Sequence, residues 1–415
     1  MIGTSKRPAR STMTMSNYDK QPYIQVSENN DDCITGWENI CSHLNSQLAQ
    51  RKPGRTVVVV DCYHGVQHSE VETSLRSGVK HELFIKSTDA FKSEAEIQEM
   101  VYPFVTDDRI FGFVTNLEID AYFDKKKLSA IRQQIDSIPE GIVVVYGEGA
   151  ACVAQHCDVL IYVDMARWEI QLRMRRNEVA NLGVANHKAE FTALYKQAFF
   201  VDWRVLDRHK VKLMDRWNFV LDTNKSGQPK LTTGDAILRG LEMASQQPFR
   251  VVPFFDPGPW GGQWLKEVAD LDRSVVNFAW AFDCVPEENS LLFKFGDVVF
   301  ELPSINLVLK KPELLLGEKV YKRFGAEFPI RFDFLDTMDG GNLSLQVHPT
   351  DEYIKEQFGM SFTQDESYYM MDAKEGAVVY LGLKEDVNPD EMITELENAQ
   401  QEGGYFDADK HVEKW

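Results

Sequence analysis

The sequence predicts a mixed fold of class α/β plus β: a doubly wound parallel-sheet domain followed by an all-β sandwich or barrel. Apolar, β-branched runs alternate with helical stretches through residues 51–245, which predicts strands covered by helices on both faces. Proline and glycine then crowd the stretch 253–262, which indicates a boundary. Short strands separated by turn residues dominate 246–415.

Composition bounds the function before any motif is considered. The chain has 415 residues, 43% of them apolar, and a formal net charge of −19. This charge argues against a nucleic-acid groove and against adsorption to an anionic membrane. Six scattered cysteines without a CxxC pair indicate reduced thiols, and no apolar run approaches the roughly 20 residues of a membrane span. We therefore expect a cytoplasmic protein with a small-molecule partner; its oligomeric state is left open.

Residues 1–50 predict a weakly ordered N-terminal extension. Residues 1–15 are rich in Ser, Thr, Arg and Lys, and Met13 and Met15 could each be a start. Within 31–50, Trp37, Ile40 and Leu44 recur at helical spacing and predict one amphipathic helix.

The α/β part is predicted from individual segments. Each predicted strand is β-branched and apolar on both faces, as buried parallel strands are. The expected strands are 56–60, 142–145 and 159–163, and the expected helices are 125–138, 165–179 and 188–207.

The segment 246–415 predicts β structure interrupted by one helix. The expected strands are 290–293, 298–302, 342–347, 368–371 and 378–381. Asn388 followed by Pro389 and two acidic residues predicts a capped helix start, and Gly403 predicts its end.

The strand predicted over 342–347 carries a possible metal site. Because side chains alternate along a strand, Ser344, Gln346 and His348 share one face. An amide oxygen and an imidazole two residues apart can reach one divalent ion, and Glu366 could join them from a neighbouring strand. A hydrogen-bonded Gln and His pair at the rim of a sheet, with Glu366 in a solvated turn, fits the same pattern.

A family resemblance favours the metal site. The Ser-x-Gln-x-His-Pro run at 344–349, the stretches 328–336 and 365–373, and the Pro-Trp-Gly-Gly-Gln-Trp-Leu run at 259–265 resemble class I mannose-6-phosphate isomerases. The resemblance covers about residues 250–415. It implies the N-terminal half of a cupin barrel, and so a partial cupin/jelly-roll domain over 246–415.

The resemblance also implies chemistry and roles. It implies one Zn²⁺ held by Gln346, His348 and Glu366, with Ser344 and Trp260 lining the pocket of a sugar phosphate. The implied reaction converts mannose 6-phosphate to fructose 6-phosphate through a cis-enediolate. The family's fourth ligand and catalytic Arg belong to the second half of the barrel and are expected beyond residue 415, so no catalytic residue is assigned and His411 is not expected to substitute.

Two positions depart from that family. Gln364 stands two residues before the implied ligand Glu366, where the family usually has Lys. Asp333 stands just before the Phe-Leu-Asp run at 334–336, where the family usually has Lys. The sequence therefore lacks two cations that would help to hold phosphate or tune a proton transfer.

The α/β part resembles uridine-kinase-like P-loop kinases in the stretches 140–149, 158–164 and 173–176. The phosphate loop is missing, because 61–68 holds one glycine and no lysine. Asp61, Tyr63 and His64 form either a remodelled ligand site or an ordinary turn. The arginines of the third stretch form either a phosphate clamp or a solvated helix face: Arg173, Arg175 and Arg176.

The main functional hypothesis is therefore a metal-dependent aldose–ketose isomerase attached to a kinase-like domain without a Walker A loop. The alternative is a non-catalytic sugar- or metal-binding regulatory protein with a pseudokinase-like domain. Active nucleoside kinase chemistry is the weakest reading.

Overall fold

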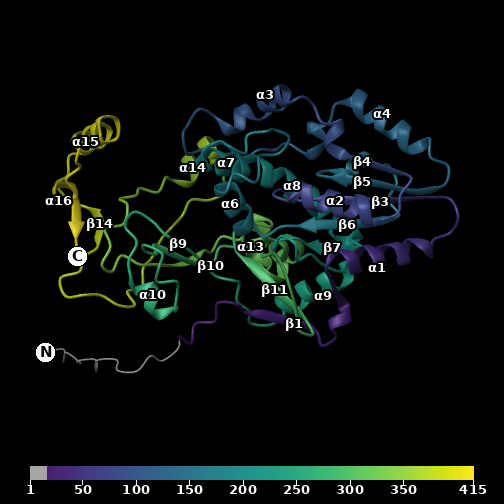
Figure 1. Cartoon of the computed structure of the whole chain (residues 1–415). Coiled ribbons are helices and arrows are strands. Elements are labelled where there is room, and N and C mark those ends of the chain that lie inside the picture. The colour runs from purple at the N-terminus through teal and green to yellow at the C-terminus, as the bar shows by residue number, and fades with distance from the viewer. Residues whose placement is uncertain (1–15) are drawn as a thin grey trace. The chain divides into compact units, whose positions relative to one another are not determined.

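The computed structural model describes residues 16–415, which form two compact units (Figure 1). The first unit extends to Asp365, and the second runs from Glu366 to Trp415. The upstream extension predicted for 1–15 lies outside the described residues.

A mostly parallel, seven-stranded sheet organises the first unit, in the order β2-β8-β7-β6-β3-β5-β4. The five strands from β7 to β4 run parallel, while β8 and β2 are antiparallel additions at one edge. All three strands predicted in the α/β part are present. The strands are β2 (Cys33–Thr35), β3 (Arg55–Cys62), β4 (Leu83–Lys86), β5 (Gly141–Gly147), β6 (Val159–Asp164), β7 (Phe219–Asp222) and β8 (Lys230–Thr233).

Helices and shorter turns connect these strands. The predicted helix 125–138 is present as α4, and the predicted helix 188–207 is divided into α7, the π-helical turn η4 and α8. The helices are α1 (Trp37–Ala49), α2 (His68–Gly78), α3 (Glu94–Val105), α4 (Lys125–Asp136), α5 (Ala150–Val153), α6 (Arg167–Arg175), α7 (Phe191–Gln197), α8 (Trp203–Leu213) and α9 (Gly234–Ser245). The turns are η1 (Asn30–Asp32), η2 (Ser87–Ala90), η3 (Ile119–Tyr122), η4 (Ala198–Asp202) and η5 (Met214–Arg216).

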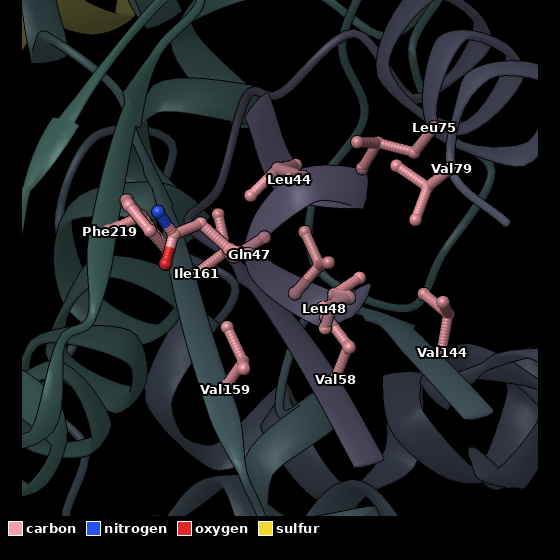
Figure 2. Close-up of a pocket in the computed structure, with 11 residues that line it drawn as sticks. Leu44, Gln47, Leu48, Val58, Leu75, Val79, Val144, Val159, Ile161 and Phe219 are labelled. Atoms are coloured by element: carbon pink, nitrogen blue, oxygen red, sulfur yellow. The ribbon is translucent and has the colours of Figure 1, made fainter. Parts of the chain in front are cut away.

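One face of the sheet is an apolar layer beneath α1 and α2. Figure 2 shows Leu44 and Leu48 of α1 above Val58 of β3, with Leu75 of α2 beside them. The gap between them has a volume of about 10 Å³, close to the lower limit for a single water. Its walls are apolar except for Gln47, so it is a packing defect of the core rather than a ligand site.

The N-terminal region differs from the prediction of a weakly ordered extension. Over the described part, β1 (Tyr23–Ser27), β2 and α1 are all built into the first unit. The helix predicted within 31–50 is present as α1, and Ile40 and Leu44 are buried in the core. Composition alone did not reveal these strands because each is short and finds its partner more than 190 residues later.

Two three-stranded sheets complete the first unit. The strands predicted at 290–293 and 298–302 are present and pair with β1 in the order β1-β11-β12; the other sheet has the order β13-β10-β9. The strands are β9 (Phe254–Asp256), β10 (Trp280–Cys284), β11 (Ser290–Phe295), β12 (Val298–Pro303) and β13 (Phe332–Leu335). The helices are α10 (Trp264–Val268), α11 (Ile305–Lys310), α12 (Pro312–Leu316), α13 (Glu318–Phe324) and α14 (Asp351–Phe358).

The predicted domain boundary at 245/246 does not separate compact units. The ring of Phe293 in β11 lies so close to Gly240 in α9 that a β-carbon there would be 2.4 Å from it. Leu291, Phe293 and Phe300 belong to the same buried cluster as the central sheet. The proline- and glycine-rich stretch 253–262 is a turn region inside the first unit.

The second unit is small. It contains β14 (Tyr380–Leu383), α15 (Pro389–Glu402), α16 (Ala408–His411) and β15 (Val412–Lys414), with β14 antiparallel to β15. The predicted helix start is confirmed: the Asn388 side chain accepts from the N–H groups of Asp390 and Glu391.

Two predicted strands are not formed. Residues 342–347 and 368–371 have no strand pairing, and the strand predicted at 378–381 begins at Tyr380. A strand exists only where a neighbour accepts its hydrogen bonds, and the described residues supply no such neighbour to these segments. Among the described residues the small sheets do not close into a barrel. No helix in the part of the chain that the structure describes is long and apolar enough to cross a membrane.

Candidate functional site

The carboxyl edge of the central sheet is the first candidate site, because open α/β sheets bind ligands where the strand order reverses. The chain leaves β3 toward β4 on one side and later crosses back to β6 on the other. Tyr63, His64 and Gly65 follow β3 at this point, where a phosphate loop would stand.

Other residues of the same chain surround this loop and form hydrogen bonds with it. Trp203 Nε1 donates to His64 Nδ1 at 3.1 Å, so the other ring nitrogen donates to the carbonyl of Ala180 at 2.8 Å. The Gly65 carbonyl accepts from Arg173 Nη1 at 2.8 Å. A phosphate cradle offers N–H groups to its ligand; this loop offers a carbonyl, and a guanidinium already covers it.

A buried ion pair occupies the space beside the loop. Tyr63 Oη donates to Asp207 Oδ1 at 2.9 Å, and Arg167 donates to both Tyr63 and Asp207. Burial disfavours the charge on Asp207, but Arg167 outweighs it and lowers the pKa of the carboxyl. Burial likewise opposes the charge on Arg167, yet Asp207 raises the pKa of the guanidinium above its ordinary value.

A second buried pair lies on the same face of the sheet. Lys210 in α8 donates to Asp164 Oδ1 at 2.7 Å and to Asn306 Oδ1 at 3.0 Å, and the lysine is 0% exposed. Asn306 also donates to the other oxygen of Asp164 at 2.6 Å. The ammonium lies 4.0 Å from the centre of the Tyr63 ring, which adds a cation–π contact.

The third pair joins Asp61 to His209 at 2.9 Å, and Cys152 Sγ lies 3.8 Å from the other ring nitrogen. Burial opposes the imidazolium, but Asp61 outweighs it and raises the pKa of His209 to about 10. Burial raises the pKa of the Cys152 thiol, so the sulfur stays protonated near neutral pH. The buried Asp61 Oδ1 has no hydrogen-bond donor among the described residues.

The structure thus gives definite places to the residues that the sequence singled out at this edge. Asp61, Tyr63 and His64 are buried and committed to internal partners. Three carboxylates face three cations, so this layer is balanced in charge and offers no spare cation for a phosphate.

The three arginines after β6 do not form one clamp. Arg173 is buried and donates to backbone carbonyls. Arg175 forms a two-bond pair with Asp256 at 2.9 and 2.8 Å. Arg176 lies on the surface with Glu169 and Glu178. The prediction of a solvated helix face therefore holds for Arg176 and is wrong for Arg173.

The second candidate site gathers the isomerase-like motifs. Trp260 is buried, its ring packs edge-to-face against Trp280 with centroids 4.8 Å apart, and its carbonyl accepts from Gly341 at 3.0 Å. A β-carbon at Gly340 would lie 2.3 Å from the same carbonyl, so only glycine permits this approach. The run 259–265 therefore packs against residues 336–341, three residues before Ser344.

The implied ligands Gln346 and His348 lie in an irregular segment of the first unit. Ser344 and Gln346 are exposed, and His348 is half-buried. His348 Nδ1 lies 2.6 Å from the Gln364 carbonyl, and the Thr363 N–H donates to Asp351 Oδ1 at 2.8 Å. The structure thus brings 348–351 next to 363–364, which the sequence separates by more than ten residues.

Glu366 begins the second unit, where its carboxylate accepts from Tyr368 Oη at 2.7 Å. His411, also in that unit, pairs with Glu395 at 2.7 Å. Among the described residues no three His, Cys, Asp or Glu side chains converge in a way that could hold a metal ion. The implied ligand set includes only two residues of these types.

Sequence reasoning missed the charged residues that fill the sheet edge. Asp207 and Lys210 lie on the stripe of α8 that also carries Trp203, Leu206 and Leu213. Charged residues at the core positions of an amphipathic helix could have indicated buried ion pairs, because buried charges are almost always paired.

Comparison with known proteins places the first part of the chain. No curated protein matches the sequence. A family model described as "Domain of unknown function (DUF8485)" matches residues 36–246, which is 211 of the 415 residues. The match begins one residue before α1 and ends one residue after α9. The chain therefore belongs to this family, the domain of unknown function DUF8485.

Proposed function

We propose that the chain carries a divalent-metal-dependent aldose–ketose isomerase segment that interconverts mannose 6-phosphate and fructose 6-phosphate. One observation carries this proposal. Two contacts in the first unit involve segments that the sequence resemblance selected or their immediate neighbours: 259–265 contacts 336–341, and 348–351 contacts 363–364. Such contacts support the proposal that these segments build one site, and we propose a partial cupin-type barrel as the framework they belong to.

In this proposal Gln346, His348 and Glu366 hold one Zn²⁺. The His348 ring fits the role, because a metal-bound imidazole commonly donates its other N–H to a carbonyl, which fixes the tautomer. With Nδ1 donating to the Gln364 carbonyl at 2.6 Å, the lone pair lies on Nε2. When bound, the metal would supply Lewis acidity toward the oxygens of the open-chain sugar.

Ser344 and Trp260 are proposed to line the sugar pocket. Trp260 can act through position, because its backbone fixes Gly341 and thereby the start of the segment that carries Ser344. Gln364 stands where the family usually has lysine, and its backbone carbonyl lies 2.6 Å from His348 Nδ1, a contact that either residue could provide.

A specific observation also favours the second candidate, a regulatory role for the α/β domain. The place of a phosphate loop is taken by Tyr63, by the Arg167–Asp207 pair and by the carbonyl of Gly65. We propose that this domain is pseudokinase-like and does not turn over ATP. All six cysteines are free thiols, which suits the cytoplasm.

The test compares zinc content and isomerase activity in the wild type, His348→Ala and the control His187→Ala. We expect near-stoichiometric zinc in the wild type and control, and loss of zinc together with turnover in His348→Ala. Zinc that persists in His348→Ala would refute the ligand assignment. Zinc bound through His348 without any turnover would favour the non-catalytic alternative, and ATP hydrolysis that Arg173→Ala abolishes would contradict the pseudokinase reading.

A further inference from the structure

A cavity of about 210 Å³ opens at the carboxyl edge of the sheet, beside the end of β7 and apart from the motif residues discussed above. Its walls come from the first turn of α6, the residues after β7, the stretch 252–254, and the strands β11 and β12. The lining residues are Trp168, Glu169, Asn224, Lys225, Val252, Pro253, Phe254, Asn289, Ser290 and Glu301. It is large enough for several waters or a small ligand.

One wall of the cavity is a carboxyl and a hydroxyl. Ser290 Oγ donates to Glu301 Oε1 at 2.6 Å. Burial raises the pKa of Glu301, and the nearby Asp222 raises it further. The Glu301 carboxyl can accept a hydrogen bond from a ligand hydroxyl.

The cavity is built rather than accidental. Asn224 holds the start of α6, since its Oδ1 accepts from the Ala166 N–H at 2.8 Å. Asn289 Nδ2 donates to the carbonyls of Val252 and Phe282 at 2.8 and 2.9 Å. Trp168 and Phe254 stack with centroids 4.2 Å apart. Buried amides and a stacked aromatic pair fix the walls, so little ordering remains for a ligand to induce.

Lys225 supplies a positive charge to the cavity. It is exposed and forms no salt bridge among the described residues, and its charge acts on Glu301 by lowering the pKa of that carboxyl against the larger effect of burial. The first N–H groups of a helix have no intrahelical acceptor, and the first turn of α6 contributes Trp168 and Glu169 to the lining. The carboxylate of Glu169 does not oppose the anion fully, because it is paired with Arg173 and Arg176.

We propose that this cavity binds a phosphorylated monosaccharide, with the phosphate at Lys225 and the first turn of α6, and a hydroxyl at the Glu301–Ser290 pair. The choice of a sugar phosphate among hydroxylated anions rests on the proposed function. The site lies beside the end of β7 in the α/β part of the fold, and binding there would need no metal. It gives the α/β domain a role as a sensor of the same sugar phosphate.

The test is calorimetric titration of the full chain with mannose 6-phosphate in EDTA, which removes the metal. We expect saturable one-site binding in the wild type. Lys225→Ala and Glu301→Ala should each weaken it by about tenfold or more, because each removes a hydrogen bond to a charged or buried group. The control Lys126→Ala, an exposed lysine of α4, should leave the affinity unchanged, as should His348→Ala.

The other outcomes overturn the proposal in distinguishable ways. Absence of binding in EDTA, or affinity that neither Lys225→Ala nor Glu301→Ala changes, excludes the cavity as the site. Binding that His348→Ala abolishes places the sugar phosphate at the motif segment and leaves the proposed function standing. Inorganic phosphate that binds as tightly as mannose 6-phosphate, with no effect of Glu301→Ala on either affinity, overturns the sugar part of the proposal.

Discussion

Side chains at the carboxyl edge of the central sheet are buried and paired, whereas most of those in the motif segment, residues 344–349, are exposed. At the sheet edge, Lys210 is 0% exposed and its charge is satisfied inside the protein. In the motif segment, the apolar Val347, which lies between Gln346 and His348 in the sequence, is 79% exposed. The polar groups of the sheet edge form contacts within the protein, whereas the motif segment exposes both polar and apolar groups to solvent. A residue pattern typical of a site therefore means little until its partners are known.

The largest effect is expected when a buried ion pair at the sheet edge is broken. Arg167→Ala leaves Asp207 buried without its partner and should lower the free energy of unfolding by about 3–5 kcal/mol. Arg176→Ala removes an exposed guanidinium one residue beyond the same helix and should cost at most about 1 kcal/mol. Urea unfolding of both variants checks the contrast, and similar losses would mean that the two environments do not differ energetically.

The next contrast makes the same substitution, Leu to Ala, in the buried core of the first unit and in the motif segment. Leu291 in β11 is 1% exposed and Leu345 is 44% exposed. Leu291→Ala should cost about 2–5 kcal/mol through lost burial and a cavity, whereas Leu345→Ala should cost about 0.5 kcal/mol or less. A large loss for Leu345→Ala in the same unfolding experiment would show that the motif segment is covered in solution.

A pH profile sharpens the comparison further. The pKa of His209 is raised from 6.5 to about 10 by Asp61, so its stabilising contribution is fully present below about pH 6.5 and lost as the pH rises toward 10. Between these values wild-type stability should fall by about 1 kcal/mol per pH unit relative to His209→Gln. The interval from pH 6.5 to 8 is the cleanest, because cysteine titration is small there. Parallel profiles for the two proteins would contradict the Asp61–His209 assignment.

The smallest expected effect compares helix caps. Ser93 caps α3 in the first unit through a reciprocal capping box, and Asn388 caps α15 in the second. Ser93→Ala and Asn388→Ala should each cost about 1 kcal/mol. Amide hydrogen exchange should then accelerate about fivefold in the helix that has lost its cap, and not in the other helix. Acceleration of α3 by Asn388→Ala would show that the two units unfold together.

Much of the α/β core was predictable because periodicity is a local signal. The strands β3, β5 and β6 are runs of β-branched residues, so residues close in sequence were enough to predict them. The same holds for the start of α15 in the second unit, which Asn388 and Pro389 indicate. The strands β1 and β2 were missed because their partners are distant. Among the site residues, the motif at 344–349 and the positions Asp61, Tyr63 and His64 after β3 could be singled out from the sequence, but their partners could not. The ionic layer was not, because pairing of Asp61 with His209 or of Asp164 with Lys210 depends on how α8 packs across the sheet.

The pairing of β1 with β11 has a consequence for synthesis of the chain. Ser27 is opposite Phe295, 268 residues later, so the whole DUF8485 region is translated between the two strands (Figure 1). At about 5–20 residues per second, β1 waits roughly 15–50 s for its partner to emerge. During that interval the apolar Ile24 and Val26 have no strand beside them, so this segment is where a chaperone would be needed first.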